Sequence, residues 1–117
     1  MSTPPVIHNL DIYKGADWGF SYIFSDEASD GTVTPTDLTG GQILAQAWDE
    51  GRECKYADFG VTYIDKENGS FSLSLTDEQT VHFPEKLNYD IVFVSTGGLK
   101  EPYIKGEINC FILYSRD

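Results

Sequence analysis

The sequence has little positive charge. Its 117 residues include 8 lysines and arginines against 19 aspartates and glutamates, which gives a formal net charge of −11. The phosphates of nucleic acids and the headgroups of anionic membranes would repel such a surface, so we expect the chain to bind neither. A basic surface on a partner protein fits this charge better.

Long apolar runs are also missing. No run approaches the roughly 20 residues that a membrane span needs. The segment Met1-Ser2-Thr3-Pro4-Pro5 has neither a basic start nor an apolar core, so we expect no signal peptide. We therefore expect the chain to be made in a cytoplasm and to stay there. In that setting we expect no disulfide between the two cysteines. Cys110 alternates with isoleucines and is predicted to be a core residue, whereas Cys54 is predicted to lie in a loop.

Residues that commonly carry catalysis or bind metals are scarce. The sequence holds no G-x-S-x-G, H-E-x-x-H, P-loop or C-x-x-C motif, and its two histidines, His8 and His82, are far apart. The carboxylates of Asp26, Glu27 and Asp30 lack the order of an EF-hand loop. We interpret them as part of a solvated loop, with Ca²⁺ binding as the alternative. We therefore expect no enzyme activity, cofactor or resident metal.

What the sequence does contain is a period-two alternation of apolar and polar residues, which is typical of half-buried antiparallel strands. Aromatic residues at even positions from Trp18 to Phe24 show it most clearly. Turn signals such as Asn68-Gly69 and Gly97-Gly98 separate the strands and predict hairpins. The expected strands cover residues 8–13, 17–25, 43–48, 59–63, 70–76, 89–94 and 104–112.

About seven short strands with frequent turns predict an all-β fold, an immunoglobulin-like antiparallel β-sandwich. One short helix is expected over residues 77–82, where Thr76 can act as the N-cap and Gln79 completes a capping box. We expect residues 1–117 to form a single domain. Within it, residues 1–6 are predicted to be a flexible arm and residues 25–37 a mobile polar loop.

The order of several short motifs carries a resemblance. Lys14-Gly15-Ala16-Asp17 precedes an aromatic strand, and Asp37-Leu38-Thr39-Gly40 leads into a strand with Ala45-Gln46. The next motif is the segment from Gly69 to Thr76, which Gln79-Thr80 follows. The chain then continues with Tyr89-Asp90-Ile91 and a last strand through Gly106. In this order the chain resembles the immunoglobulin-like domain of tailed-phage tail and baseplate proteins, such as the N-terminal domain of siphophage upper baseplate proteins. One departure concerns Lys14-Gly15-Ala16-Asp17. The family usually has Arg/Lys-Gly-Asp-Thr at this place, so this chain has one extra residue before the acid.

The resemblance implies a non-enzymatic structural protein of a tailed-phage virion, assembled in the host cytoplasm. Its expected role is that of a tail or baseplate adaptor that holds a fibre or another baseplate protein. Its expected partners are other virion proteins, and several copies would follow the symmetry of the particle.

The alternation of the last two strands suggests where partners dock. If the isoleucines of these strands face inward, and if Val94 lies opposite Tyr103 in the hairpin, the outer face is unusually apolar. We therefore predict a protein interface on this face. An error of one residue in the register, or another strand over the face, would remove it. The predicted interface residues are Val92, Val94, Tyr103, Phe111, Leu113 and Tyr114.

Two other functions remain open. A carbohydrate-binding module for a host-surface glycan would use exposed aromatic rings, for which Trp48, Tyr56 and Tyr63 are the candidates. A head decoration or neck protein would use the same fold in another part of the particle.

Overall fold

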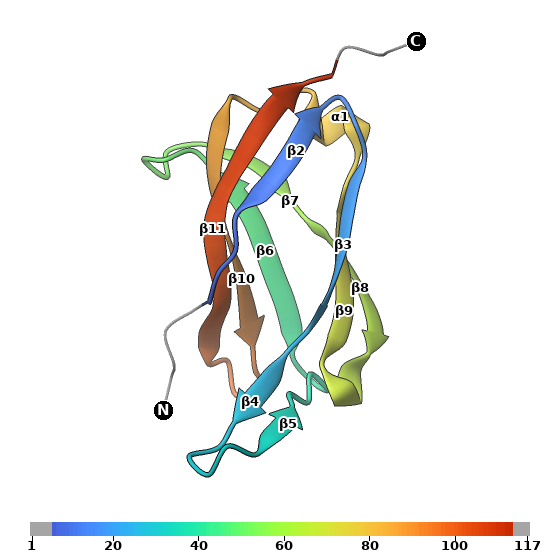
Figure 1. The fold of residues 1–117 in the computed structure, drawn as a ribbon, viewed down its shortest axis with the longest axis vertical. Coiled ribbons are helices and arrows are strands. Elements are labelled where there is room, and N and C mark those ends of the chain that lie inside the picture. Colours follow the sequence, from blue (N-terminus) through green and yellow to red (C-terminus); the bar gives the residue numbers. More distant parts are fainter. Residues whose placement is uncertain (1–5, 114–117) are drawn as a thin grey trace.

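The structure, a computed structural model of the chain, describes residues 6–113. Two sheets pack face to face, and a small two-stranded sheet lies at one end (Figure 1). Sheet A has the strand order β1-β11-β10-β6-β7, with β2 also paired to β11, and sheet B has the order β3-β9-β8. None of the helices in this part of the chain has the length and hydrophobicity that crossing a membrane requires.

Most elements are short strands, and the only helical pieces within residues 6–113 are a 3-10 turn (η1) and one turn of α-helix (α1). Their bounds are Val6–Ile7 (β1), Leu10–Lys14 (β2), Trp18–Ile23 (β3), Ser25–Glu27 (β4), Val33–Pro35 (β5), Gln42–Trp48 (β6), Lys55–Asp58 (β7), Gly60–Asp65 (β8), Lys66–Asn68 (η1), Ser70–Leu75 (β9), Asp77–Thr80 (α1), Lys86–Val94 (β10) and Lys100–Ile112 (β11).

The all-β sandwich predicted from the alternation is confirmed. The seven expected strands correspond to β2, β3, β6, β8, β9, β10 and β11, and the four other strands have two to four residues each. One face of β2, β6, β9 and β10 is buried between the sheets, because that face carries the apolar residues of the pattern, whereas β3 and β8 are buried only in part. The most deeply buried side chains are Phe71, Ile12, Leu38, Leu73, Leu75, Leu87, Ile91, Ile108 and Thr80.

The predicted helix begins where the sequence indicated. The Thr76 hydroxyl accepts a hydrogen bond from the Gln79 backbone N–H, and the Gln79 side chain accepts one from the Thr76 backbone N–H. This reciprocal capping box satisfies two N–H groups that a helix start leaves unpaired. The helix ends at Thr80, two residues earlier than expected.

Two motifs that are far apart in the sequence meet at this helix. The buried Thr80 hydroxyl accepts a hydrogen bond from the Gly15 N–H (3.0 Å) and donates one to the Ala16 carbonyl (2.8 Å). The Asp17 carboxylate accepts a hydrogen bond from the Asp77 N–H (2.8 Å). The turn between β2 and β3 is therefore held to α1 by side chains of both segments.

The polar segment 25–37, expected to be a mobile loop, is instead a hairpin. Its strands β4 and β5 pair with each other, with Asp26 opposite Thr34. The Thr36 N–H donates to the Phe24 carbonyl (2.9 Å), and the Thr36 hydroxyl donates to Asp26 (3.0 Å). The composition of the segment is polar, but its backbone groups still pair with each other. Residues 1–5 of the predicted N-terminal arm lie outside the described residues, and Val6 begins β1.

The hairpin of β10 and β11 turns at Gly97-Gly98, as expected, but its register differs from the prediction. Val94 pairs with Lys100 rather than Tyr103, since the turn takes up only residues 95–99, and the register also shifts by one residue between Ile91 and Val92. This bulge turns Tyr103 inward, where its ring lies 4.6 Å from that of Phe24. The assignment of Tyr103 to the outer face was therefore wrong.

Gly106 of β11 lies where the backbone of another segment comes very close. A methyl group at this position would overlap the carbonyl oxygen of His8, where the chain passes from β1 to β2 along the same edge. The Tyr89 hydroxyl donates a hydrogen bond to that carbonyl. The glycine therefore leaves room for the backbone of His8.

Candidate functional site

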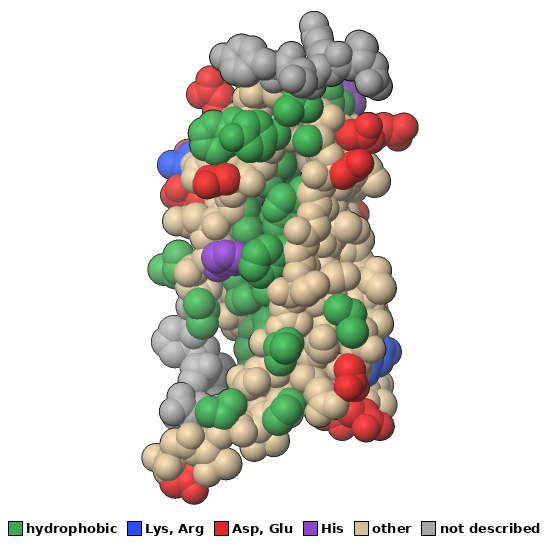
Figure 2. Space-filling model, turned by 45° about the vertical axis from the view of Figure 1, so that its right-hand side comes forward, with side chains coloured by type: hydrophobic (Ala, Val, Ile, Leu, Met, Phe, Trp, Pro, Cys, Tyr) green, Lys and Arg blue, Asp and Glu red, His purple; other side chains and the backbone are tan. Residues whose placement is uncertain are grey.

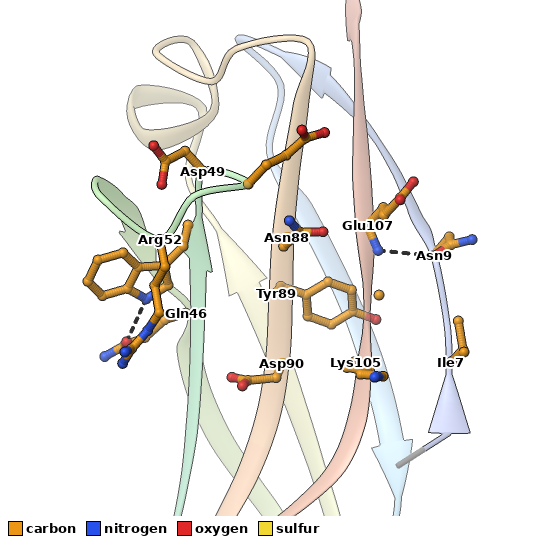
Figure 3. Close-up of a pocket in the computed structure, with 13 residues that line it drawn as sticks. Ile7, Asn9, Gln46, Asp49, Arg52, Asn88, Tyr89, Asp90, Lys105 and Glu107 are labelled. Atoms are coloured by element: carbon orange, nitrogen blue, oxygen red, sulfur yellow. Dashed lines mark hydrogen bonds between the residues drawn. The ribbon is translucent and has the colours of Figure 1, made fainter. Parts of the chain in front are cut away.

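An open cleft of about 580 Å³ lies on the outer face of sheet A (Figure 3). Its floor consists of outward-facing residues of β6, β10 and β11, and the loop that joins β6 to β7 forms one wall. Because adjacent strands place their outward side chains side by side, Gln46, Asp90 and Lys105 lie next to one another in the sheet. Most side chains at the cleft are polar or charged.

The loop after β6 is shaped by Asp49. Its carboxylate accepts hydrogen bonds from the backbone N–H groups of Glu53 (2.7 Å) and Cys54 (3.1 Å). Arg52 takes a left-handed conformation with φ of 55°, and its N–H donates to the Asp49 carbonyl (3.0 Å). The tight loop brings the Arg52 guanidinium over the ring of Trp48, 5.3 Å from the ring centroid. Such a cation–π contact stabilises both side chains at the rim of the cleft.

The charges of the cleft are mixed. Partial burial raises the pKa of the Asp90 carboxyl, and the positive charge of Arg52 acts in the opposite direction. Glu107 forms an ion pair with Lys86 (3.1 Å), and its N–H donates to the Asn9 side chain (3.0 Å). Both signs of charge are therefore presented within one concave surface, which suits polar ligands that carry donors and acceptors together.

Trp48 gives the cleft an aromatic wall. Its indole N–H donates to Gln46 (2.9 Å), so its polar atom is already satisfied inside the protein. The cleft has the volume of a typical small-ligand site and combines this ring with the planar amide and carboxyl groups of Asn88 and Asp90. It can accept a sugar ring or a polar loop of a partner protein. The sequence did not point to Gln46, Asn88, Asp90 and Arg52 as site residues, since only the pairing of distant strands brings them together.

The predicted interface residues do not form one continuous apolar face. Val92 and Val94 are half-buried on the outer face of β10, where Val92 pairs with Leu44 and Pro102. Phe111 lies toward the other end of β11, and the charged cleft separates the two places. Leu113 is half-buried just after β11, and Tyr114 lies outside the described residues.

Phe111 has an aromatic neighbour that was not predicted. It pairs with Tyr13 of β2, and the two ring centroids are 5.7 Å apart. Tyr13 is 52% exposed and Phe111 45%. We call Tyr13 and Phe111 the ring pair, and Leu44, Val92 and Pro102 the valine patch. The outer face of sheet A thus carries an apolar patch on each side of a polar cleft.

Other residues considered as candidate ligand-binding groups make contacts inside the protein. Trp48 and Tyr63 lie on different sheets, and the Tyr63 hydroxyl accepts a hydrogen bond from the Ile43 N–H (2.8 Å), so the predicted three-ring platform does not form. Asp30 accepts a hydrogen bond from the Thr32 N–H (2.9 Å), which lowers the pKa of its carboxyl.

Cysteines and possible metal ligands were also located. Cys110 is buried and Cys54 lies in the loop between β6 and β7, as predicted; Cys54 is exposed, and both are free thiols. Within residues 6–113, no three histidine, cysteine or acidic side chains are grouped so that they could hold a metal ion.

Comparisons with known proteins give little further information. No protein-family model and no curated protein matches the chain. A solved structure with a similar outline is AggA, the major subunit of aggregative adherence fimbriae type I from Escherichia coli. It has 14% sequence identity and a TM-score of 0.31, over 92% of this chain and 90% of that chain. The resemblance to phage baseplate domains therefore stays a prediction.

Proposed function

We propose that the chain is a non-enzymatic structural component of a tailed-phage virion, an adaptor of the tail or baseplate that holds a fibre or another baseplate protein. The ordered motifs of the sequence support this role. They also serve as joints of the sandwich: Thr80 binds the Gly15 turn, and Leu38 is fully buried beside η1, where its N–H donates to the Lys66 carbonyl (2.8 Å).

The observation that carries the adaptor role is the outer face of sheet A. The ring pair and the valine patch offer apolar contact area. The cleft between them offers positively and negatively charged side chains that can form hydrogen bonds. Protein interfaces combine apolar, often aromatic anchors with polar surroundings in this way. The net charge of −11 favours a basic partner, so binding should weaken as salt screens the attraction.

Co-sedimentation tests the adaptor role. In lysates of cells that produce the chain, it should sediment with tailed particles in a density gradient, and antibodies against it should label the tail. Recovery only from the unassembled fraction would contradict the proposal. Labelling of the head or neck would replace it with the decoration alternative.

A second candidate, glycan binding, is favoured by the cleft itself. The indole of Trp48, the amides of Gln46 and Asn88 and the carboxyl of Asp90 form a set of groups suited to a sugar. A glycan array probed with the wild type and with Trp48→Ala distinguishes the two functions. Binding that depends on Trp48 would support the glycan role, and an array without signal would contradict it.

A further inference from the structure

Strand β3 has an open edge. It pairs with β9 on one side, and no strand in the described part of the chain pairs with its other side. The alternation of an antiparallel ladder shows which backbone groups are free. The Phe24 N–H donates to the Gly69 carbonyl in the register that pairs Tyr22 with Phe71, so even-numbered residues of β3 face β9. The N–H and C=O groups of Gly19, Ser21 and Ile23 therefore point outward from the sheet edge.

The other sheet edges carry protective features, and β3 does not. Proteins usually protect such edges with charges, bulges, proline or very short strands. β7 has four residues, including Lys55 and Asp58, and β8 has a bulge before Asp65. The edge of β1 and β2 is interrupted at His8. β3 has six residues without charge, proline or bulge.

The edge is also apolar on its surface. Phe20 is 48% exposed, and it lies within 5.0–6.5 Å of the rings of His8, Trp18 and Tyr22. Figure 2 shows hydrophobic side chains exposed in a band along the length of the molecule. An edge of this kind is a template for another strand.

The sequence of β3 is self-complementary. In Trp18-Gly19-Phe20-Ser21-Tyr22, large aromatic residues alternate with small ones. The order of side-chain sizes is therefore the same in both directions from Phe20. We infer that two copies of this chain dimerise by pairing β3 with β3 in antiparallel orientation, about a two-fold axis at Phe20. This inference does not rest on the proposed function.

The proposed register satisfies the free backbone groups of Gly19 and Ser21. Gly19 of each copy lies opposite Ser21 of the other, and both residues have N–H and C=O groups that face the partner. Each of these pairs exchanges two hydrogen bonds, and the two Phe20 residues form the non-hydrogen-bonded pair between them, where side chains come closest. Trp18 lies opposite Tyr22. The uncharged strand meets its copy without like-charge contact, and the two-fold symmetry closes the assembly at a dimer.

Sedimentation velocity over a range of protein concentrations tests the dimer. The wild type should show a monomer–dimer equilibrium. Ser21→Pro removes an N–H that no partner within residues 6–113 uses, so it should raise the dimer dissociation constant at least about tenfold, since proline is tolerated at sheet edges but cannot donate. Ser21→Thr is the matched control, because it keeps the N–H and should dimerise like the wild type. Added salt should strengthen the dimer, because each subunit carries a net charge of −11.

The register has its own test. In a Cys54→Ser background, Phe20→Cys should form a covalent dimer on mild oxidation, since opposed residues of a non-hydrogen-bonded pair are close enough for a disulfide. Ile64→Cys, on exposed β8, should not. A wild type that stays monomeric, a folded Ser21→Pro that dimerises normally, growth into fibres, or equal cross-linking of both cysteine variants would overturn the inference. If Ser21→Pro does not fold, the cysteine pair decides.

Discussion

Tyr89 lies directly opposite Gly106 in the β10–β11 ladder, and its phenol reaches past that glycine to donate a hydrogen bond to the His8 carbonyl. The missing side chain on β11 leaves room for the His8 backbone, whose carbonyl a methyl group at Gly106 would overlap. An aromatic residue across from a glycine is a known device for stabilising a sheet at such a position. Here it also fixes the point at which β1 passes to β2.

Gly106→Ala should therefore destabilise the fold. The new methyl group would overlap the His8 carbonyl, which belongs to the backbone and cannot swing away. We expect a loss of about 1–3 kcal/mol in the free energy of unfolding, measured by urea denaturation. Gly97→Ala is the control, since nothing lies within 4 Å of its added methyl group, and it should be nearly neutral. Equal stability of both variants would refute the crowding at Gly106.

The Thr80 hydroxyl should contribute to stability through its two hydrogen bonds. Thr80→Val keeps the shape of the side chain but leaves the Gly15 N–H and the Ala16 carbonyl without this partner. We expect a loss of about 1–3 kcal/mol. Thr80→Ser keeps the hydroxyl and should lose less than Thr80→Val. If thermal and urea unfolding rank the two variants in the opposite order, the methyl group matters more than the hydrogen bonds.

Tyr22→Phe should leave stability unchanged or raise it by up to about 1 kcal/mol. The Tyr22 hydroxyl is buried and makes no hydrogen bond of good geometry with any described residue, although the nearby Tyr89 side chain acts to lower its pKa, so its removal should relieve a desolvation cost. Tyr89→Phe is the contrasting variant, because it takes a donor from the His8 carbonyl and should destabilise. A clear loss in Tyr22→Phe would show that its hydroxyl is satisfied in solution.

Alkaline pH should destabilise the protein through its buried tyrosines. Burial raises the pKa of Tyr22 to about 12, and burial together with the charges of Asp26 and Glu101 raises that of Tyr103 to about 12, from an ordinary 10.0. The unfolded chain loses these protons first, so the stabilisation is complete below pH 10 and falls as pH rises toward 12. Urea unfolding at several pH values measures this decline. Tyr22→Phe should make it shallower, and an identical decline would contradict the assignment.

The sequence predicted the long strands, the capping box and both glycine turns, because each depends on neighbouring residues. It placed Tyr103 on the wrong face because one extra residue in β11 reverses the alternation. Pro102 was a usable signal, since proline inside a paired strand often marks a bulge or an edge. The cleft was not predictable in this way, because Trp48, Asn88 and Lys105 come together only through the pairing of three separate strands.

Incorporation of variants into particles tests the adaptor role most directly. Tagged wild type and Phe111→Lys, which places a charge in the ring pair, would be produced together with the particle and compared after gradient purification. Ile64→Lys is the matched control, because it adds the same charge to an exposed apolar position on sheet B. We expect the wild type and Ile64→Lys in tailed particles, and folded Phe111→Lys to be strongly depleted. Equal incorporation of all three, or absence of the wild type from particles, would contradict the account.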